Sequence, residues 1–187
     1  MTLTGNIITT YWIVFLVVWA IGVFFQKRSQ EKPILSNIFH FLLIFVSLSI
    51  LFASQGIPFL NKIIIRVSLA VNILSVMFST LGLIVSVYSR IVLGSNWSGS
   101  AVIKKEHELV TKGPYKYVRH PIYFGIVLLY IGTAIATGNL GGIIGFMILI
   151  VEFSLKIKEE EKMMKRQFGK RYLYYMKSTK ALIPWII

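Results

Sequence analysis

The chain has 187 residues, of which 56% are hydrophobic and only 14% charged, and its net charge is +13. This composition excludes an ordinary soluble domain, because several uncharged runs approach the roughly 20 residues that span a bilayer core. The absence of cysteine excludes disulfides, thiolate metal sites and cysteine nucleophiles, and three scattered histidines do not suggest a zinc site. We therefore predict an all-α, polytopic membrane protein of about five transmembrane helices that binds no metal.

The basic residues lie beside the apolar runs, which the positive-inside rule explains better than binding to nucleic acid does. With five spans, 18 of the 20 Lys and Arg residues fall on one side of the membrane, and only Lys62 and Arg66 fall on the other. This bias predicts a multi-pass integral membrane protein with an external N-terminus and a cytoplasmic C-terminus. The oligomeric state is left open.

Three uncharged runs in the first half predict membrane spans at residues 7–25, 34–55 and 67–89. The first run has neither a basic segment before it nor a small-residue cleavage site, so we expect a retained span and not a signal peptide. His40, near the start of the second run, is expected to be an interfacial or helix-packing residue. The third run contains small or polar residues that let neighbouring helices approach closely, namely Asn72, Ser75, Ser79, Thr80, Gly82 and Ser86.

The second half contains an uncharged run from Pro121 to Val151. As one helix, its 31 residues would be roughly 46 Å long, which is too long for a hydrocarbon core of about 30 Å. The turn-like residues at 137–142 therefore predict a helical hairpin, with spans at about 121–137 and 140–155. After Lys156, apolar residues recur at near-helical spacing among basic ones. This pattern predicts an amphipathic helix that leaves the fifth span and lies on the membrane or on the protein.

A polar stretch at residues 106–125 lies beside the mouth of this hairpin and is a candidate for chemistry. Pro121 suits the first turn of a helix, which places His120 at or near the N-cap, beside exposed amides and the positive dipole end. Arg119 adds a planar cation that can bind a carboxylate, so we expect an anionic group to bind at this helix N-terminus. Tyr123 lies about one turn further on a similar face, and Gly125 allows close helix packing. Alternatively, Arg119 and His120 are snorkelling residues within an aromatic belt.

A second polar feature is the acidic triplet Glu159-Glu160-Glu161 in an otherwise basic tail. Such a run is often a solvated helix face, and acids also favour a first helical turn. Here the triplet provides three of only seven acids in the chain, so pairing with cations or with a cationic ligand is the alternative. Glu152, inside the fifth predicted span, is expected to point into the protein.

Together, the two polar features resemble the signature of isoprenylcysteine carboxyl methyltransferases and phospholipid N-methyltransferases. The first part reads His107-x-Leu109-Val110-x-x-Gly113-x-Tyr115-x-x-x-Arg119-His120-Pro121-x-Tyr123-x-Gly125. The second part reads Glu159-Glu160-Glu161, then Phe168-Gly169-x-x-Tyr172-x-x-Tyr175, then Leu182-Ile183-Pro184, and upstream Leu93-Gly94-x-Asn96-Trp97-Ser98 is also similar. The resemblance covers about residues 93–185. It divides the chain into an N-terminal three-span region at 1–92 and a methyltransferase core at 93–187.

This resemblance implies an integral-membrane methyltransferase that uses S-adenosylmethionine and a lipid or lipidated acceptor. The acceptor would be the carboxylate of an isoprenylcysteine-like compound or the amine of a phospholipid. In the family, the cofactor lies in a cytoplasmic pocket between the loop, the mouth of the hairpin and the C-terminal helix. The resemblance places His107, Leu109, Val110, Gly113, Tyr115, His120, Glu159 and Glu160 at the cofactor. It places Arg119, Tyr123 and Glu160 nearest the reacting centre as catalytic candidates, and Glu159 could exchange roles with Glu160.

Departures from this pattern keep alternatives open. Relatives often carry an arginine just before the acidic cluster, whereas this chain has Lys156 and Lys158, which supply charge without the guanidinium fork. Its acceptor could therefore differ from theirs. Membrane sterol and steroid reductases that use NADPH share a related Arg-His-Pro-x-Tyr-x-Gly hairpin, but they usually have Asn and an acid where this chain has Ile122 and Ile126. A small transporter or assembly factor without enzymatic activity is the remaining alternative.

Overall fold

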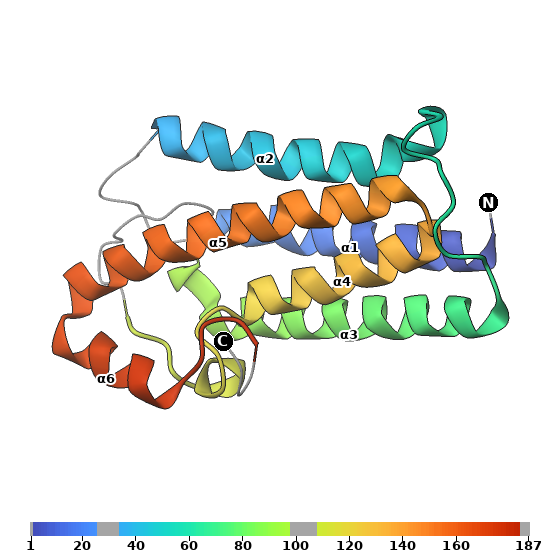
Figure 1. Cartoon of the computed structure of the whole chain (residues 1–187). Coiled ribbons are helices and arrows are strands. Elements are labelled where there is room, and N and C mark those ends of the chain that lie inside the picture. Colours follow the sequence, from blue (N-terminus) through green and yellow to red (C-terminus); the bar gives the residue numbers. More distant parts are fainter. Residues whose placement is uncertain (1, 26–33, 98–107, 184–187) are drawn as a thin grey trace.

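The computed structural model describes residues 2–25, 34–97 and 108–183 (Figure 1). The α-helices are α1 (Leu3–Phe24), α2 (Ile34–Ala53), α3 (Leu69–Leu93), α4 (Pro121–Thr137), α5 (Leu140–Phe168) and α6 (Lys170–Ser178). Short 3₁₀ segments are η1 (Ser54–Gly56), η2 (Gly94–Asn96) and η3 (Gly113–Lys116). The described residues contain no β-strand, which agrees with the all-α prediction.

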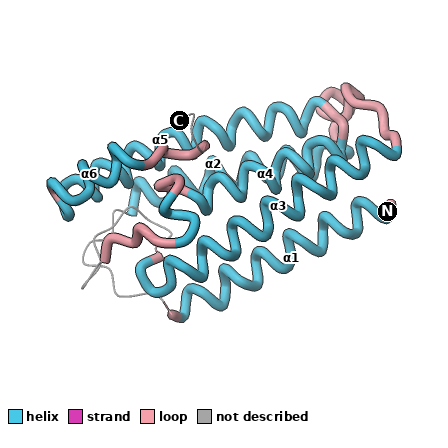
Figure 2. The backbone as a smooth tube through the Cα atoms, turned by 90° about the horizontal axis from the view of Figure 1, so that it is seen from below, coloured by secondary structure: helices cyan, strands magenta, loops and turns pink. Residues whose placement is uncertain are grey.

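Helices α1 to α5 lie alongside one another, and helices that follow one another in the chain run in opposite directions (Figure 1, Figure 2). By length and composition, α1, the α2–η1 segment, α3 and α5 could each cross a membrane. α4 is a shorter apolar helix of 17 residues. At 1.5 Å per residue it is about 26 Å long, which is close to the thickness of a hydrocarbon core. The four long apolar helices confirm the polytopic membrane architecture, and α4 is a shorter apolar helix beside them.

The predicted helical hairpin is confirmed at its turn. α4 ends at Thr137, and Gly138 then takes a left-handed conformation with a φ of 62°, which a glycine adopts at little cost. Asn139 caps the next helix, because its side-chain oxygen accepts a hydrogen bond of 3.0 Å from the amide of Gly142. The glycine and the asparagine therefore set the break in the 31-residue uncharged run.

The predicted fifth span, at about residues 140–155, is the first part of a longer helix. α5 continues through the acidic triplet to Phe168 as one helix of 29 residues. No glycine or proline occurs between residues 146 and 168, so nothing in this stretch interrupts the helix. The predicted amphipathic tail helix therefore has two parts, namely the end of α5 and the separate α6, which follows Gly169 with its φ of 52°.

α3 and α4 pack with their backbones nearly in contact. A β-carbon added at Gly82 of α3 would lie 2.3 Å from the amide nitrogen of Leu129, and one added at Gly125 of α4 would lie 2.5 Å from the amide nitrogen of Ser86. Small residues on both helices therefore permit this approach, as the sequence predicts. The close packing holds the beginning of α4, where the candidate site lies, in a fixed place against α3.

The end of the bundle remote from α6 is closed by backbone hydrogen bonds. The amide of Ile64 donates to the carbonyl oxygen of Gly138 at 2.8 Å, and the amide of Leu140 donates to that of Lys62 at 2.9 Å. The segment before α3 therefore pairs, through backbone hydrogen bonds, with the turn between α4 and α5. The polar segments that carry the signature gather at the opposite end of the bundle, beside α6 (Figure 1).

Candidate active site

The first residues of α4 and the segment before them form one wall of the candidate site. His120 is the N-cap of α4 and Pro121 is its first residue, as the sequence predicts. The amides of Arg119 and His120 donate to the carbonyl oxygens of Lys180 and Ala181 at 2.8 and 2.9 Å. The segment after α6 therefore runs alongside the entrance to α4 and holds it in place.

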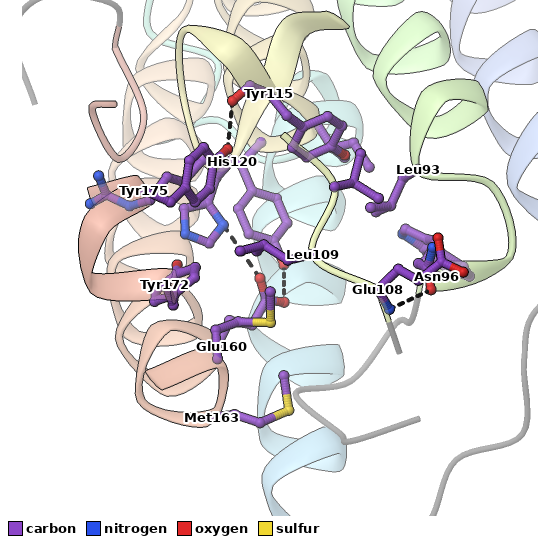
Figure 3. A pocket seen from close by; sticks show the side chains of 16 residues that line it. Leu93, Asn96, Glu108, Leu109, Tyr115, His120, Glu160, Met163, Tyr172 and Tyr175 are labelled. Carbon is purple, nitrogen blue, oxygen red and sulfur yellow. Dashed lines mark hydrogen bonds and ion pairs between the residues drawn. The ribbon is translucent and has the colours of Figure 1, made fainter. Parts of the chain in front are cut away.

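A pocket opens beside this entrance (Figure 3). Its lining comes from residues of 93–97 and 108–110, Tyr115 of η3, the start of α4, Glu160, Met163 and Met164 of α5, and Tyr172 and Tyr175 of α6. It encloses about 800 Å³, including its opening to solvent. Segments far apart in the chain thus meet around one cavity.

The carboxylate of Glu160 is held in the pocket by two neighbouring side chains. Tyr123 Oη donates a hydrogen bond of 2.5 Å to Glu160 Oε1, and His120 Nδ1 lies 3.4 Å from Glu160 Oε2. The rings of His120 and Tyr123 stack with their centroids 5.6 Å apart, and Tyr123 also stacks on Phe153 at 4.6 Å. Figure 3 shows Glu160 and His120 joined in this way at the wall of the pocket. Glu160 therefore presents a fixed negative charge to a ligand.

Arg119 binds a second carboxylate, that of Glu161. Its Nε donates to Glu161 Oε1 at 2.7 Å, and its Nη1 donates to the carbonyl oxygen of Thr179 at 2.5 Å. His120 Nε2 lies 3.6 Å from the same oxygen of Glu161, a distance that allows ion pairing but is too long for a hydrogen bond. Arg119 therefore joins the pocket wall to α5 and to the segment after α6, and it neutralises a carboxylate of the protein itself.

The third acid of the triplet, Glu159, contacts α2. Its Oε2 lies 3.1 Å from His40 Nε2, and Glu159 is not among the residues that line the pocket. Successive residues of an α-helix are turned by about 100°, so Glu159 faces His40 of α2, whereas Glu160 and Glu161 face residues at the start of α4. Of the two acids whose roles the sequence leaves interchangeable, Glu160 is the one at the pocket.

The structure brings most of the predicted site residues together. Those that line the pocket are Leu109, Val110, Tyr115, Arg119, His120, Tyr123 and Glu160. Gly113 does not line it. Gly113 begins η3 with a φ of 59°, a conformation that favours glycine, and a β-carbon there would lie 3.2 Å from Val92. His107 lies outside the described residues, so its role at the cofactor stays a prediction.

Sequence reasoning did not select some of the residues that line the pocket. Asn96 and Trp97 follow α3, Tyr172 belongs to α6, and Met163 and Met164 lie about one turn beyond the acidic triplet. The first three occur in the signature quoted above and could have been chosen from it. The two methionines have no such signal, because their spacing in the chain is equally typical of helix packing.

The environment of the pocket changes the acid–base behaviour of its side chains. Burial lowers the pKa of His120, but its contact with Glu160 and the negative charges of Glu160 and Glu161 outweigh burial and raise this pKa above its ordinary value. Burial raises the pKa of Tyr115 and of Tyr175 well above the ordinary value, so both phenols stay protonated. The hydroxyl of Tyr175 uses its proton to donate to the carbonyl oxygen of Tyr115 at 2.5 Å, which ties α6 to η3.

Comparison with known proteins identifies the family. The model of the family described as phospholipid methyltransferase matches residues 70–171, which is more than half of the chain. The chain belongs to the phospholipid methyltransferase family. The region that matches this family runs from α3 to the first turn of α6 and contains His120, Tyr123 and Glu160.

Curated relatives are similar to part of the chain. It is 40% identical over 96 residues to the protein-S-isoprenylcysteine O-methyltransferase of Dictyostelium discoideum, a match that covers 50% of this chain and 40% of the relative. It is 30% identical over 109 residues to the protein-S-isoprenylcysteine O-methyltransferase B of Arabidopsis thaliana, with 57% of this chain and 55% of the relative covered. The chain thus spans about half the length of these curated relatives, or less.

A solved structure shares the fold. It is that of the eukaryotic intramembrane Ras methyltransferase ICMT, isoprenylcysteine carboxyl methyltransferase, with a TM-score of 0.57 and 25% sequence identity. The match covers 84% of this chain and 55% of that one. Membership of the phospholipid methyltransferase family, together with this fold, favours the methyltransferase interpretation over the reductase and transporter alternatives. The predicted division of the chain at residue 92 stays a prediction, and the family match begins before it, within α3.

Proposed function

We propose that this chain is an integral-membrane methyltransferase that moves a methyl group from S-adenosylmethionine to a lipophilic acceptor. The preferred acceptor is the carboxylate of an isoprenylcysteine-like compound, and a phospholipid amine is the second class. The observation that carries the proposal is the pocket in which Glu160 meets His120 and Tyr123. Both parts of the methyltransferase signature contribute side chains to this one cavity.

The residues of the pocket suit S-adenosylmethionine as the cofactor. Its sulfonium and ammonium groups are cations, and Glu108 and Glu160 bring carboxyl groups to the lining. Trp97 and Tyr115 bring aromatic rings, which suit a purine or a cation. His120 Nε2 is buried with no hydrogen-bond partner among the described residues, and a buried polar atom of this kind is usually satisfied by a ligand or water.

Bound S-adenosylmethionine would supply the methyl group, whose bond to sulfur breaks as a bond to the acceptor oxygen forms, leaving a neutral thioether. Such an in-line displacement depends mainly on alignment, which the walls of the pocket provide. Glu160, held by Tyr123 and His120, favours a cationic group beside it. A carboxylate acceptor is already ionised near neutral pH, so the reaction needs no general base.

The environment of His120 favours the carboxylate as acceptor. An amine acceptor has to lose a proton before it can attack, and a histidine in the pocket would be the natural base for that step. His120 lies between Glu160 and Glu161, so both of its ring nitrogens face carboxylates of the protein itself, which also raise its pKa. The relatives from Dictyostelium and Arabidopsis are named O-methyltransferases, which supports the same choice.

The proposed function includes an orientation in the membrane, with the pocket facing the cytoplasm and the N-terminus outside. The pocket and α6 lie at one end of the bundle, and residues 54–68 lie at the other (Figure 1). Of the basic residues that the structure describes, only Lys62 and Arg66 belong to that other end, a bias that supports the orientation. The polar cofactor would then enter from the cytoplasm and the lipid tail of the acceptor from the bilayer.

A labelled-methyl assay tests the proposed function. The full chain, purified into nanodiscs, is incubated with methyl-labelled S-adenosylmethionine and either S-farnesyl-N-acetylcysteine or phosphatidylethanolamine. We expect label in the farnesylcysteine fraction as a base-labile methyl ester, and none with a Glu160→Gln variant beyond a small residual rate. Label only in the phospholipid would move the acceptor to the amine class. Calorimetric binding of NADPH without binding of S-adenosylmethionine would instead support the reductase alternative.

A further inference from the structure

A buried ionisable cluster joins α2 to α5 outside the pocket. His40 of α2 is 3% exposed, and its Nδ1 lies 3.1 Å from Glu152 Oε1 while its Nε2 lies 3.1 Å from Glu159 Oε2. Glu152 is fully buried, and Glu159 is about half exposed. The proposed chemistry uses none of these three side chains, and none of them lines the pocket.

The contacts of His40 make this cluster more specific than ordinary helix packing. A carboxylate oxygen only accepts hydrogen bonds, and a neutral imidazole has a single N–H group to donate. With a carboxyl group at each ring nitrogen, both contacts are satisfied only when the cluster holds one additional proton, on His40 or on Glu152 or Glu159. A buried charged group that loses its partner is strongly destabilising, so the three residues act as one unit.

The same helix pair is held together by polar contacts further along its length. Ser47 Oγ donates to the carbonyl oxygen of Gly145 at 2.8 Å, and Asn139 Nδ2 donates to Ser54 Oγ at 2.8 Å. His40, Ser47 and Ser54 are seven residues apart, so they fall on nearly the same face of the α2–η1 segment. Figure 1 shows this segment lying along α5. Of these three residues on the α2–η1 segment, His40 is the one that contacts the acidic triplet of α5, through Glu159.

We propose that His40 is a positioning residue for the cofactor pocket, an inference that rests on the function proposed above. By holding Glu152 and Glu159, His40 fixes the rotation of α5 about its own axis. Because the next residue of a helix is turned by about 100°, this rotation directs Glu160 into the pocket. The N-terminal region, which carries no part of the methyltransferase signature, thus helps to shape the site.

The test compares three variants of the full chain in nanodiscs. His40→Leu removes both contacts to α5, whereas His40→Gln keeps an amide that can hold one carboxyl group. Ser47→Ala is the matched control, because it removes a buried polar contact from the same helix pair two turns away from His40. The measurements are the Kd for S-adenosylmethionine by calorimetry, kcat and both KM values with S-farnesyl-N-acetylcysteine, and the melting temperature.

We expect His40→Leu to lower kcat/KM for S-adenosylmethionine by about ten- to hundredfold, because a misplacement of about 1 Å can cost on the order of a hundredfold. The KM for the lipid acceptor should change less than that for the cofactor. His40→Gln should recover most of the loss. Ser47→Ala should lower the melting temperature while leaving the Kd for S-adenosylmethionine at the wild-type value.

Two results would overturn the inference. One is a folded His40→Leu variant with wild-type Kd and kcat, and the other is an equal loss of binding in Ser47→Ala. If His40→Leu does not fold, Glu159→Leu decides the question at a half-exposed position, where wild-type binding again overturns the inference and weakened binding supports it. A wild-type chain that does not bind S-adenosylmethionine would overturn the proposed function itself, which is a separate outcome.

Discussion

Tyr123 of α4 and Glu160 of α5, 37 residues apart in the chain, share a hydrogen bond of 2.5 Å between Oη and Oε1. This bond joins the two parts of the signature at one point of the pocket wall. The ring of Tyr123 stacks on both His120 and Phe153, so the position of the hydroxyl is fixed independently of the bond it makes. The contribution of the hydroxyl can therefore be separated from that of the ring.

Tyr123→Phe removes this hydroxyl and keeps the stacked ring. We expect the free energy of unfolding to fall by only about 1 kcal/mol, the usual net value of one hydrogen bond. We expect kcat/KM to fall by about tenfold, because Glu160 loses a partner that holds its charged form in place. Thermal unfolding in detergent and initial rates measure the two effects. A wild-type rate would show that the hydroxyl plays no part in the site.

Glu160→Gln keeps the shape of the side chain and removes its negative charge. We expect kcat/KM for S-adenosylmethionine to fall by roughly ten- to hundredfold, since a hydrogen bond or contact to a charged group is worth about 1.5–3 kcal/mol. Glu159→Gln is the control, because Glu159 does not line the pocket and glutamine can still accept from His40. Equal losses in the two variants would contradict the assignment of Glu160 to the pocket.

Arg119→Lys tests whether Arg119 holds the segment after α6. Lysine keeps the charge but cannot bind Glu161 and the carbonyl oxygen of Thr179 together, as the guanidinium does. We expect the amide of residue 120, which donates to Ala181, to exchange with deuterium about ten- to hundredfold faster. Hydrogen-exchange mass spectrometry measures this rate. Unchanged exchange at residue 120 would show that the backbone contacts alone hold the segment.

The raised pKa of His120 predicts a pH dependence of stability. The folded chain binds the proton of His120 more tightly than the unfolded chain does, whose histidine has a pKa of about 6.5. This contribution to stability is therefore fully present below about pH 6.5 and is lost as the pH rises through the raised pKa of the folded state. We expect the melting temperature to fall over that window, and to fall less in Glu161→Gln. If His120→Gln had the same pH dependence of the melting temperature as the wild type, protonation of His120 would not be its cause.

Gly82→Ala tests the close packing of α3 against α4. The added methyl group would lie 2.3 Å from the backbone of Leu129. Because the neighbour is backbone and not a flexible side chain, it cannot move aside without a shift of the helix. We expect a loss of about 1–3 kcal/mol in unfolding free energy, which is typical of overpacking. Gly56→Ala is the matched control, since nothing lies within 4 Å of a β-carbon there. Equal stability of the two variants would contradict the tight α3–α4 contact.

Features that depend on neighbours in the chain could be predicted from the sequence. Gly138 and Asn139 mark the turn of the hairpin, and His120 before Pro121 marks the start of α4, because turn and cap preferences are local. The membrane architecture follows from the uncharged runs for the same reason. The match to the signature then brought Glu160 and Tyr123 into one candidate site.

Features that depend on distant partners could not be predicted in the same way. The periodicity of α5 does not say which of the acids 159–161 faces which helix, since a small rotation of the helix changes every partner. His40 was expected to be an interfacial or helix-packing residue, and its ion-pair partners were not predicted, because they lie 112 and 119 residues away and carry no local signal. The change in polarity after residue 155 indicates where the span ends, but it does not say that the same helix continues to Phe168.

The pairing of Arg119 and His120 with Lys180 and Ala181 has a practical consequence for protein engineering. A bulky fusion placed directly after Ala181 would strain the backbone hydrogen bonds that hold the entrance to α4. α1 begins at the other end of the bundle, away from the pocket (Figure 1). Affinity tags and fluorescent reporters for this protein therefore belong before α1, where their movement does not reach the binding pocket.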